Sequence, residues 1–200
     1  MKVVAFGAAG LASVMAAAAA PPFGRLTEIP LRAGISQIQN FAPGGRDARI
    51  ITAWRDNGNS HGYRLYLVLM PTKPGWTDWN VVGFETGNDF SDEIRDEPHT
   101  GEDVVTAVRF VREGLRRTPL VVAATRKWTE TYYDRAQTVM TIYQLRRNDG
   151  GPGTQDYFGV AKRWAAKKRY CNAELALRDE LRLPLPPDYG GPNKVDGCVK

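Results

Sequence analysis

The chain has little cysteine and little histidine, with two of each in 200 residues. Because His61 and His99 are the only imidazole ligands available, a zinc centre is disfavoured. Cys171 and Cys198 stand too far apart in the sequence for a CxxC redox motif or a zinc knuckle. The sequence therefore predicts no cofactor.

Charge is nearly absent from the N-terminus, where Lys2 precedes an uncharged, alanine-rich run that ends at Ala20. A basic start, an apolar middle and small residues at the end are typical of a secretory signal peptide, with cleavage expected after Ala18 or Ala19. The run is barely long enough to cross a bilayer and lacks a basic stop-transfer flank, which disfavours a retained anchor. We expect residues 1–19 to be removed, leaving a soluble periplasmic or secreted protein without a transmembrane segment.

Export changes the interpretation of the two cysteines. In an oxidising compartment, Cys171 and Cys198 are expected to form a disulfide bond. Closing a loop of about 28 residues stabilises a fold by roughly 3–4 kcal/mol in the chain-entropy model. The bond would fasten the Pro/Gly-rich C-terminal tail to the body of the protein.

The formal net charge is +5, but it is unevenly distributed. Residues 85–103 contain eight acids and one base, Arg95, so the rest of the mature chain is strongly basic. Such a surface favours a protein or an anionic envelope component as the partner. Nucleic acid is not expected, because export removes the usual target and no nucleic-acid-binding module is recognisable.

The domain organisation is simple. Residues 20–45 are rich in proline, glycine and polar side chains, and they predict an N-terminal arm or linker with one short strand around 29–38. Residues 46–200 follow as a single domain, with its tail tied by the disulfide.

The domain contains a run of strand signals followed by one helix signal. Residues 172–183 predict a helix that Asn172 caps and Pro184 ends, whereas 158–164 fit either a strand or a helix. Strands without interposed helices favour an antiparallel sheet. The predicted fold class is α+β, a mainly antiparallel sheet of about six strands with a C-terminal helix packed on it. The expected strands are 50–54, 63–70, 79–85, 103–111, 120–128 and 138–146.

The stretch GNSHG, residues 58–62, matches the G-x-S-x-G pattern of many serine hydrolases. A nucleophile elbow requires a strand before the serine and a helix after it, but here a second strand follows. The stretch is therefore interpreted as a hairpin turn. The alternative is a small secreted hydrolase that uses Ser60 with His99 and a nearby acid.

The acidic stretch 85–103 offers many carboxylates, which are the ligands that calcium prefers. EF-hand spacing counted from Asp89 fails, because Ile94 stands where a glycine is needed and Thr100 where a bidentate acid is needed. A solvated loop is the preferred interpretation. A looser metal site is the weak alternative, with Asp89, Asp92, Glu93 and Asp96 as its ligands.

The basic run 162–170 places Trp164 and Tyr170 among five cations, and two further tryptophans stand in PGWTDWN. Such residues can dock an anionic polymer or a membrane surface, although a solvated basic face with its aromatics in the core is the simpler interpretation. The candidate binding residues are Trp76, Trp79, Arg163, Trp164, Lys167 and Lys168.

These observations favour a non-enzymatic binding or accessory protein of the bacterial cell envelope, acting as a subunit or an inhibitor through its basic and aromatic surface. The serine hydrolase is the alternative. The sequence leaves the oligomeric state open.

Overall fold

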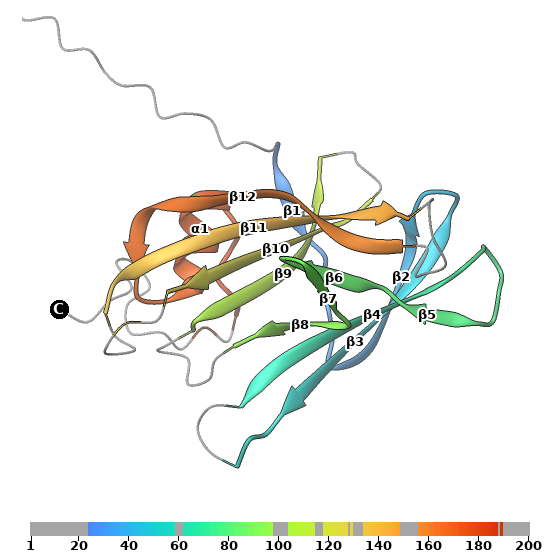
Figure 1. The fold of residues 1–200 in the computed structure, drawn as a ribbon, viewed down its shortest axis with the longest axis horizontal. Coiled ribbons are helices and arrows are strands. Elements are labelled where there is room, and N and C mark those ends of the chain that lie inside the picture. Colours follow the sequence, from blue (N-terminus) through green and yellow to red (C-terminus); the bar gives the residue numbers. More distant parts are fainter. Residues whose placement is uncertain are drawn as a thin grey trace, which may run out of the picture.

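The computed structural model describes residues 24–58, 62–97, 104–114, 118–127, 129, 134–148, 156–187 and 189. They form two β-sheets and one helix (Figure 1). The large sheet has seven strands in the order β1-β9-β10-β11-β12-β6-β7. Its strands are β1 (Leu26–Glu28), β6 (Gly83–Thr86), β7 (Asp89–Ser91), β9 (Thr106–Glu113), β10 (Leu120–Arg126), β11 (Ala136–Arg147) and β12 (Asp156–Tyr170).

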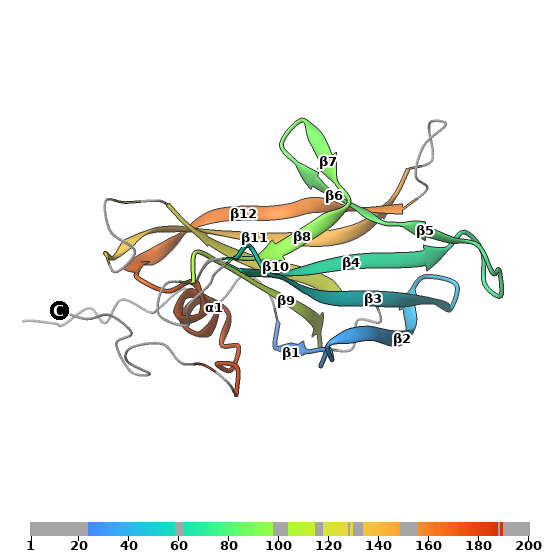
Figure 2. The same ribbon diagram turned by 90° about the horizontal axis from the view of Figure 1, so that it is seen from below.

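The small sheet has five strands and contains the order β2-β3-β4-β5, with β8 also paired to β4. Its strands are β2 (Gly34–Ala42), β3 (Arg46–Arg55), β4 (Tyr63–Pro71), β5 (Trp79–Val81) and β8 (Glu93–Asp96). All pairings in both sheets are antiparallel except that of β12 with β6. In Figure 2 the β6–β7 hairpin projects away from the body of the molecule.

The predicted fold class is confirmed: the protein is a mainly antiparallel sheet structure with a C-terminal helix packed on it. The six predicted segments all contain strands, although 79–85 is divided at Val82. The ambiguous segment around Trp164 belongs to β12, the longest strand. The short strand expected around 29–38 overlaps β2. The strands β1, β7 and β8 were missed because each has only three or four residues, too few for an alternating pattern to register.

Residues from the expected N-terminal arm contribute to both sheets. β1 pairs with β9, and β2 pairs with β3 along most of its length. Phe41, on β2, is fully buried between the sheets. The sequence-based boundary at residue 45 thus falls in the turn that connects β2 to β3.

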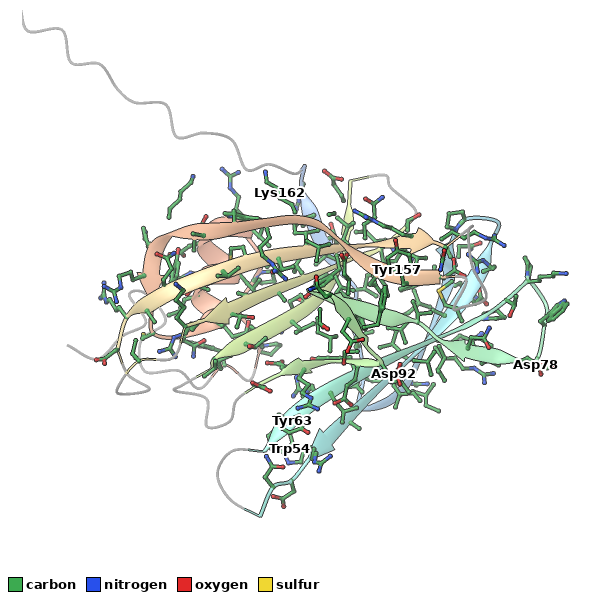
Figure 3. The ribbon with its side chains drawn as sticks, viewed as in Figure 1. Trp54, Tyr63, Asp78, Asp92, Tyr157 and Lys162 are labelled. Atoms are coloured by element: carbon green, nitrogen blue, oxygen red, sulfur yellow. The ribbon has the colours of Figure 1, made fainter. Side chains whose placement is uncertain are left out.

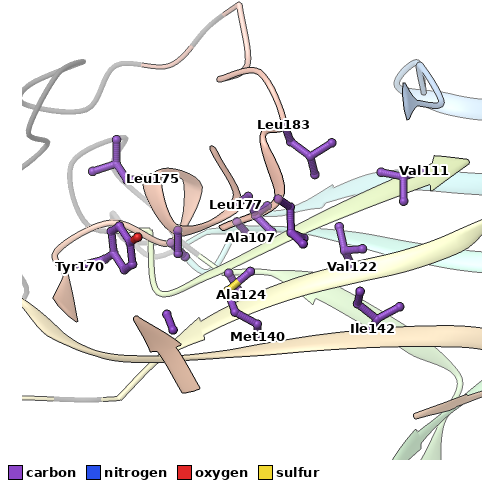
Figure 4. Packing of buried hydrophobic residues seen from close by; sticks show 14 of the residues in the cluster. Ala107, Val111, Val122, Ala124, Met140, Ile142, Tyr170, Leu175, Leu177 and Leu183 are labelled. Atoms are coloured by element: carbon purple, nitrogen blue, oxygen red, sulfur yellow. The ribbon is translucent and has the colours of Figure 1, made fainter. Parts of the chain in front are cut away.

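The large sheet separates two hydrophobic cores. Side chains alternate across a strand, so β9 directs Ala107 and Val111 to one face and Val108 and Phe110 to the other. The first face is covered by the helix (Figure 4), and the second is covered by the small sheet. The helix lies toward one end of the molecule and β5 lies toward the other (Figures 1 and 2).

The helix α1 (Ala173–Leu181) forms where local chemistry predicts it. The Asn172 side chain accepts a 2.9 Å hydrogen bond from the backbone N–H of Glu174, which caps the first turn. Arg182 adopts a left-handed conformation and ends the helix two residues before Pro184. Leu175, Leu177 and other apolar side chains of α1 pack on β9, β10, β11 and β12.

Within the part of the chain that the structure describes, no helix has the length and apolar character needed to cross a membrane. Cys171 is buried at the end of β12, next to the helix cap. Cys198 lies outside the described residues, so the disulfide stays a prediction.

Candidate functional site

A buried arginine stands at the incompletely covered edge of β9. The pairing of β1 with β9 ends where the backbone N–H of Ile29 donates to the carbonyl of Phe110 at 2.8 Å. Two residues earlier, the carbonyl of Val108 points to the same side, where no described strand pairs with it. Arg109 satisfies this carbonyl with its own side chain, because Nη1 donates to it at 2.7 Å.

The guanidinium of Arg109 gathers acidic side chains from three elements. Nη2 lies 2.6 Å from Oε1 of Glu174 on α1, and Nε lies 3.4 Å from Oε1 of Glu28 on β1. Nη1 lies 3.9 Å from Oδ2 of Asp96 on β8. Arg109 and Glu174 are both 7% exposed. A charge pair this deeply buried is held in place by hydrogen bonds and by packing on all sides.

Asp96 connects this cluster to the inner face of the small sheet. It stands opposite Arg64 on β4, and the hydroxyl of Tyr66 donates to it at 3.4 Å. Burial raises the pKa of Asp96 to about 7, and the negative charge of Glu174 adds to this rise. The positive charges of Arg109 and Arg64 oppose it. The carboxyl of Asp96 therefore titrates near neutral pH.

Burial also perturbs two neighbouring groups. It raises the pKa of Tyr66 to about 12, so the phenol remains a hydrogen-bond donor at physiological pH. Burial raises the pKa of Glu174, although the charge of Arg109 opposes the rise. Perturbed groups concentrated at one place are typical of functional sites, and they are also found in structural networks.

A cleft opens beside this cluster, between the two sheets, with a volume of about 290 Å³. We call it the inter-sheet cleft. One side is β9 from Val108 to Phe110, and the other is the inner face of β3 and β4. The connection between β1 and β2 and the segment after α1 complete it. Its lining residues are Glu28, Ile29, Leu31, Arg32, Ala33, Thr52, Arg64, Tyr66, Val108, Arg109, Phe110, Pro186 and Pro187.

The lining combines an apolar base with a cationic mouth. The rings of Tyr66 and Phe110 pack 5.6 Å apart between the sheets. Three arginines and one glutamate line the cleft, and the charge of Arg109 is compensated by the acids that surround it. The other two arginines, Arg32 and Arg64, are exposed, so the positive charge faces the opening.

One polar group in the cleft lacks a partner. Thr52 lies opposite Tyr66 on the neighbouring strand and is 9% exposed. Its buried Oγ1 makes no hydrogen bond with any described residue. A buried hydroxyl without a partner costs about 1–3 kcal/mol, which a bound polar ligand would recover.

The structure does not bring the predicted binding residues together on one surface. Trp76 is 48% exposed in the turn between β4 and β5, under the ammonium of Lys73. Trp79 is partly buried on β5, with the guanidinium of Arg49 at 4.1 Å from its ring centroid. Asp78, which stands between the two tryptophans, marks their end of the molecule in Figure 3, opposite to α1.

The other predicted binding residues lie on β12. Trp164 is opposite Met140 and packs against the helix-side core. Lys168 Nζ lies 3.7 Å from Oδ2 of Asp179 on α1, and the backbone N–H of Lys167 donates to Glu180 of the same helix. Arg163 is exposed. β12 thus gathers an exposed basic stretch without the two tryptophans of PGWTDWN.

The residues of the hydrolase alternative, Ser60 and His99, lie outside the described residues. The strands on either side of Ser60 are β3 and β4, which form an antiparallel hairpin. β4 also pairs with β8, with Arg64 opposite Asp96. The strand ends that lead to Ser60 and to His99 are therefore neighbours in the small sheet.

The four acids of the weak metal alternative serve separate contacts. Asp89 accepts from the backbone N–H of Phe90, and Glu93 binds Arg95 at 2.7 Å. Asp92 is exposed, whereas Asp96 faces Tyr66. Among the described residues, no group of three or more histidine, cysteine, aspartate or glutamate side chains is placed to hold a metal ion.

Sequence reasoning missed the inter-sheet cleft and its central arginine. The only local signal is the position of Arg109 as the one charge inside the apolar, β-branched stretch VVTAVRFV. A charge in an otherwise apolar strand requires a partner, but the partner is Glu174, which lies far along the chain.

Comparison with known proteins supports the fold and goes no further. No family model matches the chain, and no curated protein sequence matches it. A solved structure described as "Crystal structure of CarG" has a TM-score of 0.62 and 18% sequence identity; the match covers 76% of this chain and 94% of that one. At this identity the likeness shows a shared fold alone.

Proposed function

We propose that this protein is a non-enzymatic binding protein of the bacterial cell envelope, and that its inter-sheet cleft takes a small anionic ligand with an apolar portion. The N-terminal signal pattern supports the export of the protein to the periplasm or beyond. The observation that carries the ligand proposal is the unpartnered, buried Oγ1 of Thr52 in a cleft lined by three arginines.

The chemistry of the ligand follows from the lining. An arginine pairs a carboxylate or a phosphate through its planar set of N–H donors, so Arg64 and Arg32 suit a negatively charged head group. The apolar side chains at the base, including Ile29 and Phe110, suit a short hydrocarbon portion. A volume of about 290 Å³ limits the ligand to a small molecule or to one end of a larger envelope component.

The proposal is tested with three six-carbon probes that differ only in charge: hexanoate, hexanol and hexylamine. Amide chemical shifts of the ¹⁵N-labelled mature protein report binding and its location. We expect hexanoate to cause saturable shifts at Ile29, Thr52 and Val108, and hexylamine to cause none there. Equal binding of all three probes, or shifts confined to other regions, would reject an anion-selective cleft.

Two variants add specificity to this test. Arg64→Gln should weaken hexanoate binding by about tenfold, equivalent to about 1.4 kcal/mol. The matched control, Arg169→Gln, changes an exposed arginine on β12 and should leave the affinity unchanged.

Thr52→Val should stabilise the free protein, because it removes the unpaired hydroxyl, and it should weaken binding. A variant that is less stable and binds equally well would contradict the role given to Thr52.

A protein or polymer partner that docks on the basic stretch of β12 is a second form of the binding proposal. The exposure of Arg163, Lys167 and Lys168 supports it. Such docking would weaken with salt and with the double substitution Lys167→Glu/Lys168→Glu. Association that resists both changes excludes this surface.

The hydrolase alternative is supported by one relationship, the pairing of β4 with β8. It makes neighbours of the strand ends that lead to Ser60 and to His99. A serine-directed phosphonate probe decides this alternative. Covalent labelling that is lost in Ser60→Ala supports it, and a wild-type protein that never labels rejects it.

A further inference from the structure

The outer face of the small sheet, the one turned away from the large sheet, carries a row of apolar side chains. Ile35, Ile51 and Leu67 stand directly opposite one another on β2, β3 and β4. They point outward, because the residues that alternate with them on β3 and β4, such as Ile50 and Val68, are buried in the core between the sheets. The same outward face carries Ala53, Leu65, Leu69 and Val81, together with Gln37 and Arg49, which stand in register with Leu69.

This pattern differs from that of an antiparallel sheet face that remains in water. Such a face normally carries polar side chains at alternate positions. Here Ile35 is 53% exposed, and the leucines of β4 are only partly buried by their neighbours on the sheet. The single described helix, α1, packs on the strands of the large sheet. Within the described chain, no helix therefore covers the outer face of the small sheet.

The face is large enough to form the centre of an interface. Four strands spaced about 4.8 Å apart, and rows spanning five residues at about 3.3 Å each, give an area of roughly 300 Å². This is at the lower end of the range for the largest apolar patches on monomeric proteins, roughly 300–600 Å², which are often functional. A standard interface takes roughly 800 Å² from each partner, so the polar side chains around this centre would supply the larger part of the contact.

The rim carries charges of both signs. Glu93 and Arg95, on β8, stand opposite Leu67 and Leu65, and Asp47 and Arg49 stand on β3; Arg49 and Arg95 are exposed. A membrane surface carries charge of one sign, so a face that binds a membrane would carry a rim of the opposite sign only. A flat apolar centre with a mixed rim is instead complementary to a second copy of itself, because a twofold axis can set opposite charges against each other.

We propose that two copies of the mature protein form a symmetric dimer in which the outer faces of their small sheets pack against each other. Sheets packed face to face lie about 10 Å apart, so Ile51 and Leu67 of one copy would interdigitate with the same side chains of the other. The dimer would leave the inter-sheet cleft open, because the cleft lies on the opposite, inner face of β3 and β4. The proposal is therefore independent of the ligand.

Sedimentation velocity of the oxidised mature protein, from micromolar to hundreds of micromolar concentration, tests the dimer. We expect the wild type to sediment as a dimer and its melting temperature to rise with protein concentration. Leu67→Lys puts one charge from each copy into the apolar centre and should weaken dimerisation by at least about a hundredfold. The control, Phe90→Lys, changes a residue that is 58% exposed on β7 of the large sheet and should leave dimerisation unchanged.

A wild-type protein that stays monomeric at every concentration overturns the proposal, and this result does not depend on any variant folding. It would leave the face to another segment of the chain or to a different protein. A dimer that Leu67→Lys leaves intact also overturns it, because the interface must then lie elsewhere. Circular dichroism of the dilute variant establishes that the loss of the dimer is not caused by unfolding.

Discussion

Arg109 Nη2 lies 2.6 Å from Oε1 of Glu174, and this contact joins β9 to the first turn of α1 across residues that are both 7% exposed. Asp96, from the small sheet, stands 3.9 Å from the same guanidinium. One buried cation thus connects the helix, the large sheet and the small sheet. We expect this cluster to couple the stability of the three layers.

The first prediction concerns the loss of this cation. Arg109→Met should lower the free energy of unfolding by about 3–5 kcal/mol, because it leaves buried carboxylates without a counter-charge. The double variant Arg109→Met/Glu174→Met should recover part of that loss, since it removes one of the stranded charges. Urea denaturation of the three proteins measures both effects.

A surface ion pair provides the control for this experiment. Lys168 and Asp179 lie 3.7 Å apart, and the lysine side chain is 73% exposed. Lys168→Met should change the free energy of unfolding by no more than about 1 kcal/mol. If Arg109→Met costs as little as Lys168→Met, the buried cluster does not hold the layers together.

The second prediction concerns the pH dependence of stability. The folded-state pKa of Asp96 is raised to about 7 from its ordinary value of 3.8, chiefly by burial, so the protonated carboxyl favours the folded state. The stability it contributes is fully present below about pH 4 and is lost as the pH rises through about 7. Glu174, whose pKa is also raised, acts in the same direction, while Arg64 and Arg109 limit the loss.

Asp96→Asn should remove the contribution of this carboxyl. Because each unit of pKa shift corresponds to about 1.4 kcal/mol, the wild type should lose about 1–4 kcal/mol relative to the variant between pH 4 and pH 8. Chemical denaturation across this range measures the difference. Parallel stability curves for the two proteins would show that Asp96 does not titrate there.

The third prediction concerns the C-terminal disulfide. Cys171 is buried beside the cap of α1, and the proposed partner, Cys198, follows the Pro/Gly-rich tail. Reduction should raise the intact mass by two hydrogens and lower the free energy of unfolding by about 3–4 kcal/mol. In a Cys171→Ala/Cys198→Ala protein the reductant should have no effect. Free thiols in the native, exported protein would disprove the bond.

The sequence by itself determined the elements that depend on neighbouring residues. The helix was predictable because Asn172 can cap it and Pro184 cannot continue it, and both effects act within a few residues. The alternation in YRLYLVLM likewise predicted β4 and its two faces correctly, with Tyr66 and Val68 on one face and Leu65 and Leu67 on the other. It could not say which face is buried, because both are apolar.

Only the tertiary structure decided the site. Arg109 and Glu174 are 65 residues apart in the chain, and Thr52 reaches the inter-sheet cleft only because β3 and β4 pack over β9. The parallel pairing of β12 with β6 and the separation of Trp76 from Trp164 were equally inaccessible to local reasoning. Such contacts are set by the free energy of burying whole faces against one another, and that energy depends on every strand in both sheets.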